Sequence, residues 1–197
     1  MDPKRNILRS ATDFAAFTAE NFISPGDVVV DATCGNGRDT LFLASRRPSK
    51  LYAFDIQASA VASTRELLIS SGYRQQLCSG AFSLINASHS FIARYVKERP
   101  RVIMFNLGYL PGGSRAITTS ASSTIEAVKA SLSILNPGGL ICVTMYSGHP
   151  EGAEEQEALL SFSSALDSSL YHVSTVTMIN QRSHPPQNLF ITSKAPY

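Results

Sequence analysis

The stretch Val28-Val29-Val30-Asp31-Ala32-Thr33-Cys34-Gly35-Asn36-Gly37 decides the fold. An apolar run ends in an acid, and two glycines then lead into a polar segment. Glycine lets the backbone turn sharply and approach a ligand closely, and the N-terminus of a following helix offers free N–H groups. The stretch therefore predicts a strand, a tight turn and a helix that together hold a nucleotide-like cofactor.

Outward from this stretch, apolar runs alternate with segments of helical spacing. The spacing predicts strands at 27–31, 51–55, 81–86, 101–106, 139–145, 170–179 and 187–193, and helices at 5–23, 37–46, 57–71, 89–98, 119–135 and 152–167. Runs such as Val102-Ile103-Met104-Phe105 are continuous, which is typical of strands covered on both faces. We expect an α/β fold, a doubly wound seven-stranded sheet, mostly parallel with a late antiparallel strand.

Size and composition fit a single domain over residues 1–197, with residues 1–24 forming an N-terminal helix on the core. No apolar run approaches the roughly 20 residues of a membrane helix, and the N-terminus lacks the apolar region of a secretory signal. Three cysteines without a CxxC pair predict no metal site and a reducing compartment. The net charge of +2 neither demands nor excludes nucleic acid.

The chemistry of the cofactor follows from two acids at strand ends. Asp55 lies 24 residues after Asp31, about where an acid binds a ribose diol. Thr40 stands where a dinucleotide-binding turn has its third glycine, and Asp31 would repel a pyrophosphate. A carboxylate there instead attracts a cationic amino-acid end, which favours S-adenosylmethionine over NAD. The alternative to a cofactor site is a tight turn that binds no ligand.

The third strand ends at Asn86, close to where adenine should lie. Asn86 or Ser88 could hydrogen-bond the adenine edge, while His89 is either a cofactor contact or a helix-start residue facing water.

Asn106-Leu107-Gly108-Tyr109-Leu110-Pro111, after the fourth strand, is the candidate catalytic segment. A carboxamide oxygen at Asn106 can accept a hydrogen bond from an attacking N–H, and Tyr109 can stack on a base. The segment resembles the Asn-Pro-Pro-Tyr loops of amino-directed methyltransferases; a glycine-rich turn with an incidental tyrosine is the alternative. Further candidates for substrate contact on the same rim are Arg115, Thr118, Thr119, Tyr146 and His149, of which His149 is also a candidate base.

Taken together, these segments resemble the MnmM-type tRNA methyltransferases, a family long labelled rRNA methylases. The resemblance runs from about residue 10 to near the end of the chain. It implies a Rossmann-like class I methyltransferase that uses S-adenosylmethionine, releases S-adenosylhomocysteine, and methylates the 5-aminomethyl group of (2-thio)uridine at the tRNA wobble position. The cofactor-binding residues expected from the motifs are Asp31, Thr33, Gly35, Asn36, Gly37, Asp39, Thr40, Asp55, Ile56, Gln57, Ser88, His89 and Asn106. Asn106, Tyr109 and His149 are expected to be catalytic, and Leu107, Gly108, Tyr109, Leu110, Pro111, Arg115, Thr118, Thr119, Tyr146 and His149 to contact substrate.

Other readings stay open at this stage. The acceptor is either this tRNA nucleoside or another target, such as rRNA, a protein side chain or a small amine. A third possibility is a degenerate methyltransferase fold that binds RNA or a partner protein without catalysis. The expected partner is the tRNA anticodon stem-loop, with a homodimer as a further expectation and no membrane. The compartment is the cytoplasm, or a chloroplast or other organelle for a plant chain. Basic clusters at 4–9, 46–50 and 94–101 are candidates for phosphate contact.

Overall fold

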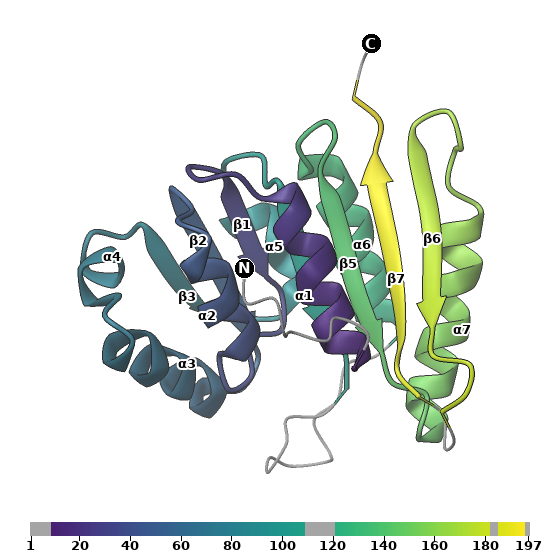
Figure 1. Ribbon diagram of the computed structural model, residues 1–197, viewed down its shortest axis with the longest axis horizontal. Helices are drawn as coiled ribbons and strands as arrows, with labels where there is room; N and C mark the ends of the chain where they lie inside the picture. The colour runs from purple at the N-terminus through teal and green to yellow at the C-terminus, as the bar shows by residue number, and fades with distance from the viewer. Residues whose placement is uncertain (1–8, 109–120, 182–184, 196–197) are drawn as a thin grey trace.

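The computed structural model describes residues 9–108, 121–181 and 185–195, and these form one seven-stranded sheet in the order β3-β2-β1-β4-β5-β7-β6 (Figure 1). Strand β7 runs antiparallel to both of its neighbours, as expected for a late strand, while the pairs that join β1 to β5 are parallel. The strands are β1 (Val28–Asp31), β2 (Lys50–Asp55), β3 (Phe82–Asn86), β4 (Val102–Asn106), β5 (Leu140–Met145), β6 (Tyr171–Thr177) and β7 (Gln187–Ser193).

Helices cover both faces of the sheet. Helices α1 (Ala11–Phe22), α2 (Arg38–Ser45) and α3 (Ala58–Ser70) bury apolar side chains against one face, in a cluster that includes Ala19, Leu43 and Leu68. On the other face lie α5 (Ile92–Tyr95), α6 (Ala121–Ile134) and α7 (Pro150–Ser164) (Figure 1). The continuous apolar runs of β4 and β5 are buried between these layers, which confirms the doubly wound sheet.

The register brings the carboxyl ends of the parallel strands together. Asp55 pairs with Asn86, and Asn106 pairs with Thr144. The strand order reverses between β1 and β4, which is where open sheets of this kind bind ligands. We call this edge, from Asn86 across to Thr144, the carboxyl rim.

Several predicted boundaries were wrong for local reasons. Helix α1 begins at Ala11 rather than 5, because Ser10 is extended and its hydroxyl accepts a hydrogen bond from the Asp13 N–H. The helix predicted at 89–98 is a 3₁₀ turn (η1, His89–Phe91) followed by α5, and Val96 is already extended. A short helix, α4 (Arg74–Cys78), was missed because it is less than two turns long.

Helix α7 starts at Pro150, two residues early, and ends at Ser164 rather than 167. Strand β6 is shorter than expected, and the start of the helix predicted at 119–135 lies partly outside the described residues. Within the described ranges no helix is long and apolar enough to cross a membrane, and no cluster of acids, histidines and cysteines could hold a metal ion.

Candidate active site at the carboxyl rim

The turn after β1 has a geometry that requires glycine at residue 37. Gly37 has a φ of +82°, and a Cβ there would lie 3.0 Å from the Thr64 Cα. Thr64 of α3 also donates its hydroxyl to the Gly35 carbonyl, at 3.0 Å. Asn36 is exposed at the tip of the turn. The turn is therefore clamped against α3, a contact that sequence spacing gave no means of finding.

Asp31 is a buried carboxylate, 1% exposed, at the end of β1. It accepts hydrogen bonds from the Thr33 N–H (3.1 Å) and the Thr40 hydroxyl (2.5 Å). Burial raises its pKa to about 7, with a further rise from the charge of Asp39, although the two hydrogen bonds oppose the shift. No cationic group among the described residues counters that rise, so the carboxylate is suited to a cationic ligand.

Asp55, at the end of β2, is held by backbone donors on both oxygens. The Gly35 N–H donates to Oδ2 at 3.0 Å and the Gln57 N–H donates to Oδ1 at 2.8 Å. Each oxygen keeps a second lone pair for a ribose hydroxyl. Ile56 is 50% exposed beside it, which offers an apolar surface to a base.

The adenine side of the predicted site differs from expectation. Asn86 donates both of its amide hydrogen bonds to the carbonyls of Asp55 and Ile56, at 2.9 Å each, and Ser88 caps η1. The reading in which His89 faces water is wrong: the ring is 7% exposed and packs edge-on to Phe105. Burial lowers the pKa of His89 to about 4, so this imidazole is neutral at physiological pH.

Asn106, at the end of β4, lies beside two titratable side chains. Its backbone N–H donates to the Thr33 hydroxyl (2.7 Å), and its Nδ2 donates to Asp39 Oδ2 (3.3 Å). Burial raises the pKa of Tyr146, as does the charge of Asp39, while a hydrogen bond with Asn106 lowers it. Gly108 adopts a φ of +123° next to the Tyr146 ring. Asp39, Asn106 and Tyr146 thus form one constellation.

Two of the predicted substrate contacts have structural roles in the described part of the chain. The Leu107 side chain is 3% exposed in the hydrophobic core, so only its backbone reaches the carboxyl rim. His149 is the N-cap of α7, where Nδ1 accepts the Gly152 N–H at 3.0 Å and lies 3.3 Å from Glu151 Oε2. The remaining predicted contacts lie outside the described residues: Tyr109, Leu110, Pro111, Arg115, Thr118 and Thr119.

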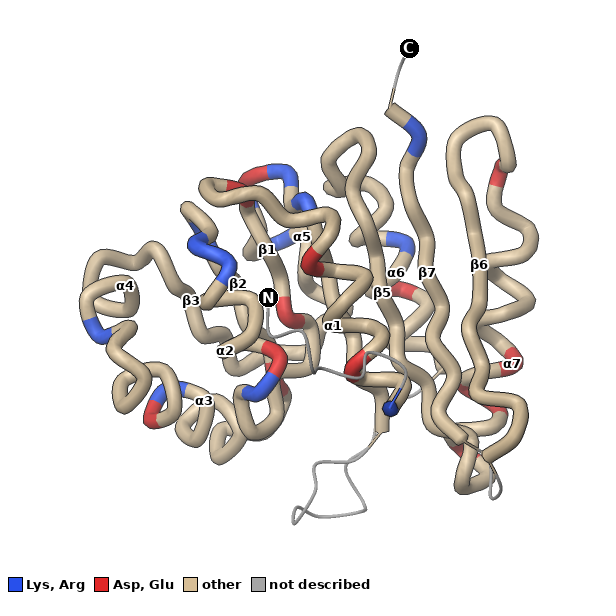
Figure 2. The backbone as a smooth tube through the Cα atoms, viewed as in Figure 1, with Lys and Arg blue, Asp and Glu red and all other residues tan. Residues whose placement is uncertain are grey.

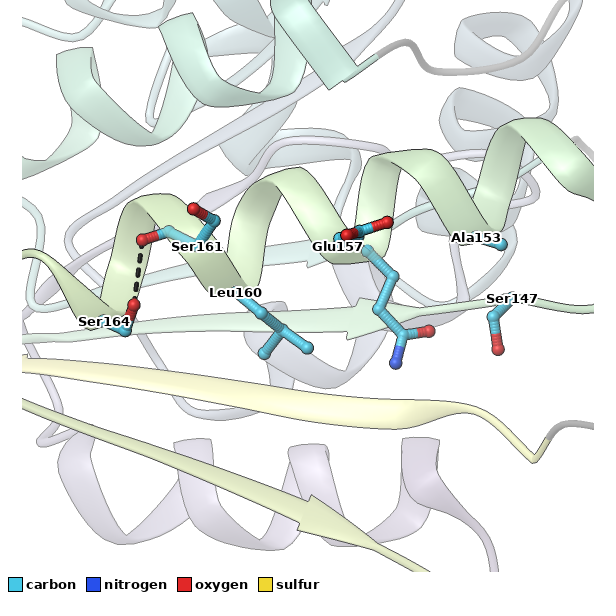
Figure 3. A pocket seen from close by; sticks show the side chains of 7 residues that line it. Ser147, Ala153, Glu157, Leu160, Ser161 and Ser164 are labelled. Carbon is cyan, nitrogen blue, oxygen red and sulfur yellow. Dashed lines mark hydrogen bonds between the residues drawn. The ribbon is translucent and has the colours of Figure 1, made fainter.

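A groove of about 590 Å³ runs along α7 (Figure 3). Ser147 lies at one end, and the other lining residues repeat at helical spacing: Ala153, Gln156, Glu157, Leu160, Ser161 and Ser164. Gln156 is tied to Gln187 of β7 by a 2.6 Å hydrogen bond. The lining contains no cation, so the groove is a poor match for phosphate.

Two of the three predicted basic clusters lie at the opposite end of the sheet. Figure 2 shows Lys and Arg in blue at this end of β2. Lys50 begins β2, and Arg101 directly precedes β4. Both are used structurally: Lys50 donates to the Gly80 carbonyl, and Arg101 donates to the carbonyls of Phe22 and Pro137. Of the cluster at 4–9, Arg9 is described and exposed just before α1.

The start of α1 is held at the carboxyl rim by a buried network that sequence reasoning missed. Asn188 Nδ2 donates to the Ala11 carbonyl (2.8 Å), and its Oδ1 accepts the Thr144 hydroxyl (2.9 Å). These residues are far apart in sequence and have no motif in common, so nothing in the sequence could have paired them.

Sequence comparison identifies the family. The profile described as "Putative rRNA methylase" matches residues 51–192, which is most of the chain. The chain belongs to this family. It is 40% identical over 183 residues to the chloroplastic tRNA (mnm(5)s(2)U34)-methyltransferase of Arabidopsis thaliana, covering 88% of this chain and 66% of that relative.

Solved structures agree with the family assignment. A family member from Clostridium thermocellum superposes with a TM-score of 0.88 at 34% identity, covering 94% of this chain and 98% of its own. A Streptococcus mutans methyltransferase in complex with SAH gives a TM-score of 0.81 at 35% identity, with 92% and 97% coverage. The Rossmann-like methyltransferase fold expected from the sequence is thereby confirmed.

Proposed function

We propose that the chain is an S-adenosylmethionine-dependent N-methyltransferase. Its acceptor would be the 5-aminomethyl group of (2-thio)uridine at the tRNA wobble position. The 40% identical plant relative is named for the methylated form of this nucleoside. The observation that carries the proposal is the position of Asn106, whose carboxamide lies between Asp39 and Tyr146 at the point where the strand order reverses.

The residues at the carboxyl rim fit this cofactor. Asp31 is a buried carboxylate whose pKa is raised to about 7, with no described cation to counter the rise, and the cofactor's ammonium and sulfonium groups would supply positive charge. Asp55 would bind the ribose, and the exposed Ile56 the adenine. When bound, the cofactor supplies an electrophilic methyl group.

The chain's own residues would prepare the acceptor amine. An alkyl amine with a pKa of about 10.4 arrives mostly protonated and must lose that proton before its lone pair can attack. The Asn106 oxygen can accept an N–H from the neutral amine and orient the lone pair. The nitrogen lone pair would then take the methyl group that the bound cofactor supplies, leaving the electron pair of the methyl–sulfur bond on sulfur, and the methylated ammonium would lose a proton to solvent. His149 and Tyr109 remain the predicted routes by which the protonated amine loses its proton to solvent before the attack.

The acceptor partner would be the anticodon stem-loop of a tRNA. Among the described residues, exposed cations at this end of the sheet include Arg9, before α1, and Arg38, at the start of α2, and Arg115 is predicted to join them. The compartment would be wherever that tRNA is read: the bacterial cytoplasm, or a chloroplast as for the plant relative.

A homodimer, proposed from the small size of the domain, would use the β6 edge. Strand β6 is a seven-residue edge strand without a single charge, and Val173 is 37% exposed. Such an unprotected edge can pair with a second copy without placing like charges opposite each other. Light scattering over a range of concentrations would show a dimer; a monomer at all of them would refute this part.

The test is methyl transfer to tRNA carrying 5-aminomethyluridine at the wobble position, with nucleosides read by mass spectrometry. We expect a gain of one methyl group on that nucleoside only, and a loss of roughly 10³-fold in turnover for Asn106→Ala, since a positioned polar contact at the reacting atom is lost. Cofactor binding by that variant should persist if Asn106 acts on the acceptor; a loss of cofactor affinity would instead support the cofactor-binding role that the sequence predicts for Asn106.

The matched control is Glu66→Gln, an exposed substitution on α3 that should leave turnover unchanged. tRNA without the aminomethyl group should gain nothing. Methylation of ribosomal RNA instead, or of the unmodified tRNA, would contradict the proposed acceptor while keeping the enzyme class.

A further inference from the structure

Asn106 can only act as described if its carboxamide points the right way. An asparagine side chain carries one acceptor oxygen and one NH₂ group, and a flip of the amide exchanges them. With the NH₂ group toward the substrate, Asn106 would repel the N–H that it is meant to accept. The site therefore needs a group that fixes the amide, and the backbone bond from Asn106 to Thr33 cannot do so.

We propose that Asp39 is a positioning residue, whose carboxylate holds the Asn106 nitrogen and so turns the Asn106 oxygen toward the incoming amine. This inference rests on the proposed function. The two side chains come from α2 and β4, 67 residues apart, and meet at 3.3 Å between Asn106 Nδ2 and Asp39 Oδ2. An ionised carboxylate accepts hydrogen bonds only, so it selects one of the two amide orientations.

The surroundings of Asp39 support a functional rather than a stabilising role. Burial raises the pKa of Asp39, while the hydrogen bond from Asn106 and the neighbouring Arg38 lower it. Its charge in turn raises the pKa of Asp31 and of Tyr146. Placing the acid Asp39 beside the buried acid Asp31 makes the folded state less stable when both are ionised. Among the described residues, the one side-chain hydrogen bond that Asp39 makes is with Asn106.

The sequence predicts Asp39 as a cofactor ligand, and the two roles lead to different kinetics. A cofactor ligand would lose affinity when neutralised. A positioning residue would lose turnover, because substrate is bound but the acceptor oxygen is misdirected. Removing the Asp39 charge also lets Asp31 ionise more readily, which offsets the lost attraction for the cationic cofactor.

The experiment compares wild type, Asp39→Asn, Asn106→Ala, the double variant and the surface control Glu66→Gln. We expect Asp39→Asn to lower kcat roughly 10- to 100-fold, with the cofactor Kd changed by less than about threefold. In the Asn106→Ala background the same substitution should cost nothing further. A weakened Kd with kcat retained would make Asp39 a cofactor ligand, and additive losses would show that it does not act through Asn106; either result overturns the inference.

A second measurement needs no RNA and separates this inference from the proposed function. The side-chain amide resonances of Asn106, assigned by their loss in Asn106→Ala, should shift with pH in the wild type. The described titratable or charged groups that interact with Asp39 are Asp31, Arg38, Cys142 and Tyr146, and Asp55 acts on Asp31 in turn. Asp39→Asn should change these resonances and reduce their pH dependence, whereas indifference to the substitution refutes the inference. A wild type that shows this coupling but no methyl transfer to tRNA would refute the acceptor alone.

Discussion

The two ends of the sheet treat charge in opposite ways. At the carboxyl rim, Asp31 and Asp39 lie close enough that the charge of Asp39 raises the pKa of Asp31. At the amino ends, Arg46 pairs with Glu20, and Arg101 donates to two backbone carbonyls. Charges are satisfied where they hold the fold together, and left in mutual repulsion where a cationic ligand would relieve it. The difference indicates that the rim gives up stability for binding.

The substitution Asp31→Asn should give the largest effect that tests this contrast between the two ends of the sheet. Losing the buried carboxylate should weaken S-adenosylmethionine binding by about 100-fold or more, because an opposite charge in a buried site is lost. The same change should stabilise the folded protein near pH 7.5 by on the order of 2 kcal/mol, since a buried acid with a raised pKa no longer has to ionise. Calorimetric titration and thermal unfolding measure the two effects.

The sign of the stability effect depends on pH. The pKa of Asp31 rises from an ordinary 3.8 to about 7 on folding, so the folded state holds the proton more tightly. The contribution of Asp31 to the free energy of unfolding is therefore fully present below pH 3.8 and is lost as the pH rises through about 7. The variant should therefore exceed wild type at pH 7.5 and match it near pH 4. A variant that is less stable than wild type at both pH 4 and pH 7.5 would contradict the view that the carboxyl rim is built at a cost in stability.

A smaller effect is expected in the pH dependence of cofactor binding. The cationic cofactor binds the ionised Asp31, so wild-type affinity should rise by up to about tenfold per pH unit below pH 7 and then level off. Asp31→Asn should show a nearly flat profile over this range. A wild-type profile that is equally flat would mean that Asp31 is already ionised in the free protein.

The sequence predicted the rim better than it predicted the contacts within it. Asp31, Asp55 and Asn106 each follow an apolar strand, and strand order alone places such residues at one end of a parallel sheet. The bond between Asp39 and Asn106 depends on where α2 begins relative to β4, and no local pattern encodes that distance. Leu107 lies within a recognisable motif, yet packing places its side chain in the core.

The smallest expected effect on binding and turnover lies at the amino ends, with Arg101→Ala. Its guanidinium donates from Nε to the Phe22 carbonyl and from Nη1 to the Pro137 carbonyl, at 3.1 Å each, and so ties the end of α1 to the turn before β5. Losing both should cost about 1–3 kcal/mol of unfolding free energy, measured by urea denaturation. Arg94→Ala, an exposed control, should cost less than about 0.5 kcal/mol. Methyl transfer at saturating cofactor should be unchanged in both, because neither arginine lies at the carboxyl rim; a loss of turnover in Arg101→Ala without unfolding would show that the two ends are coupled.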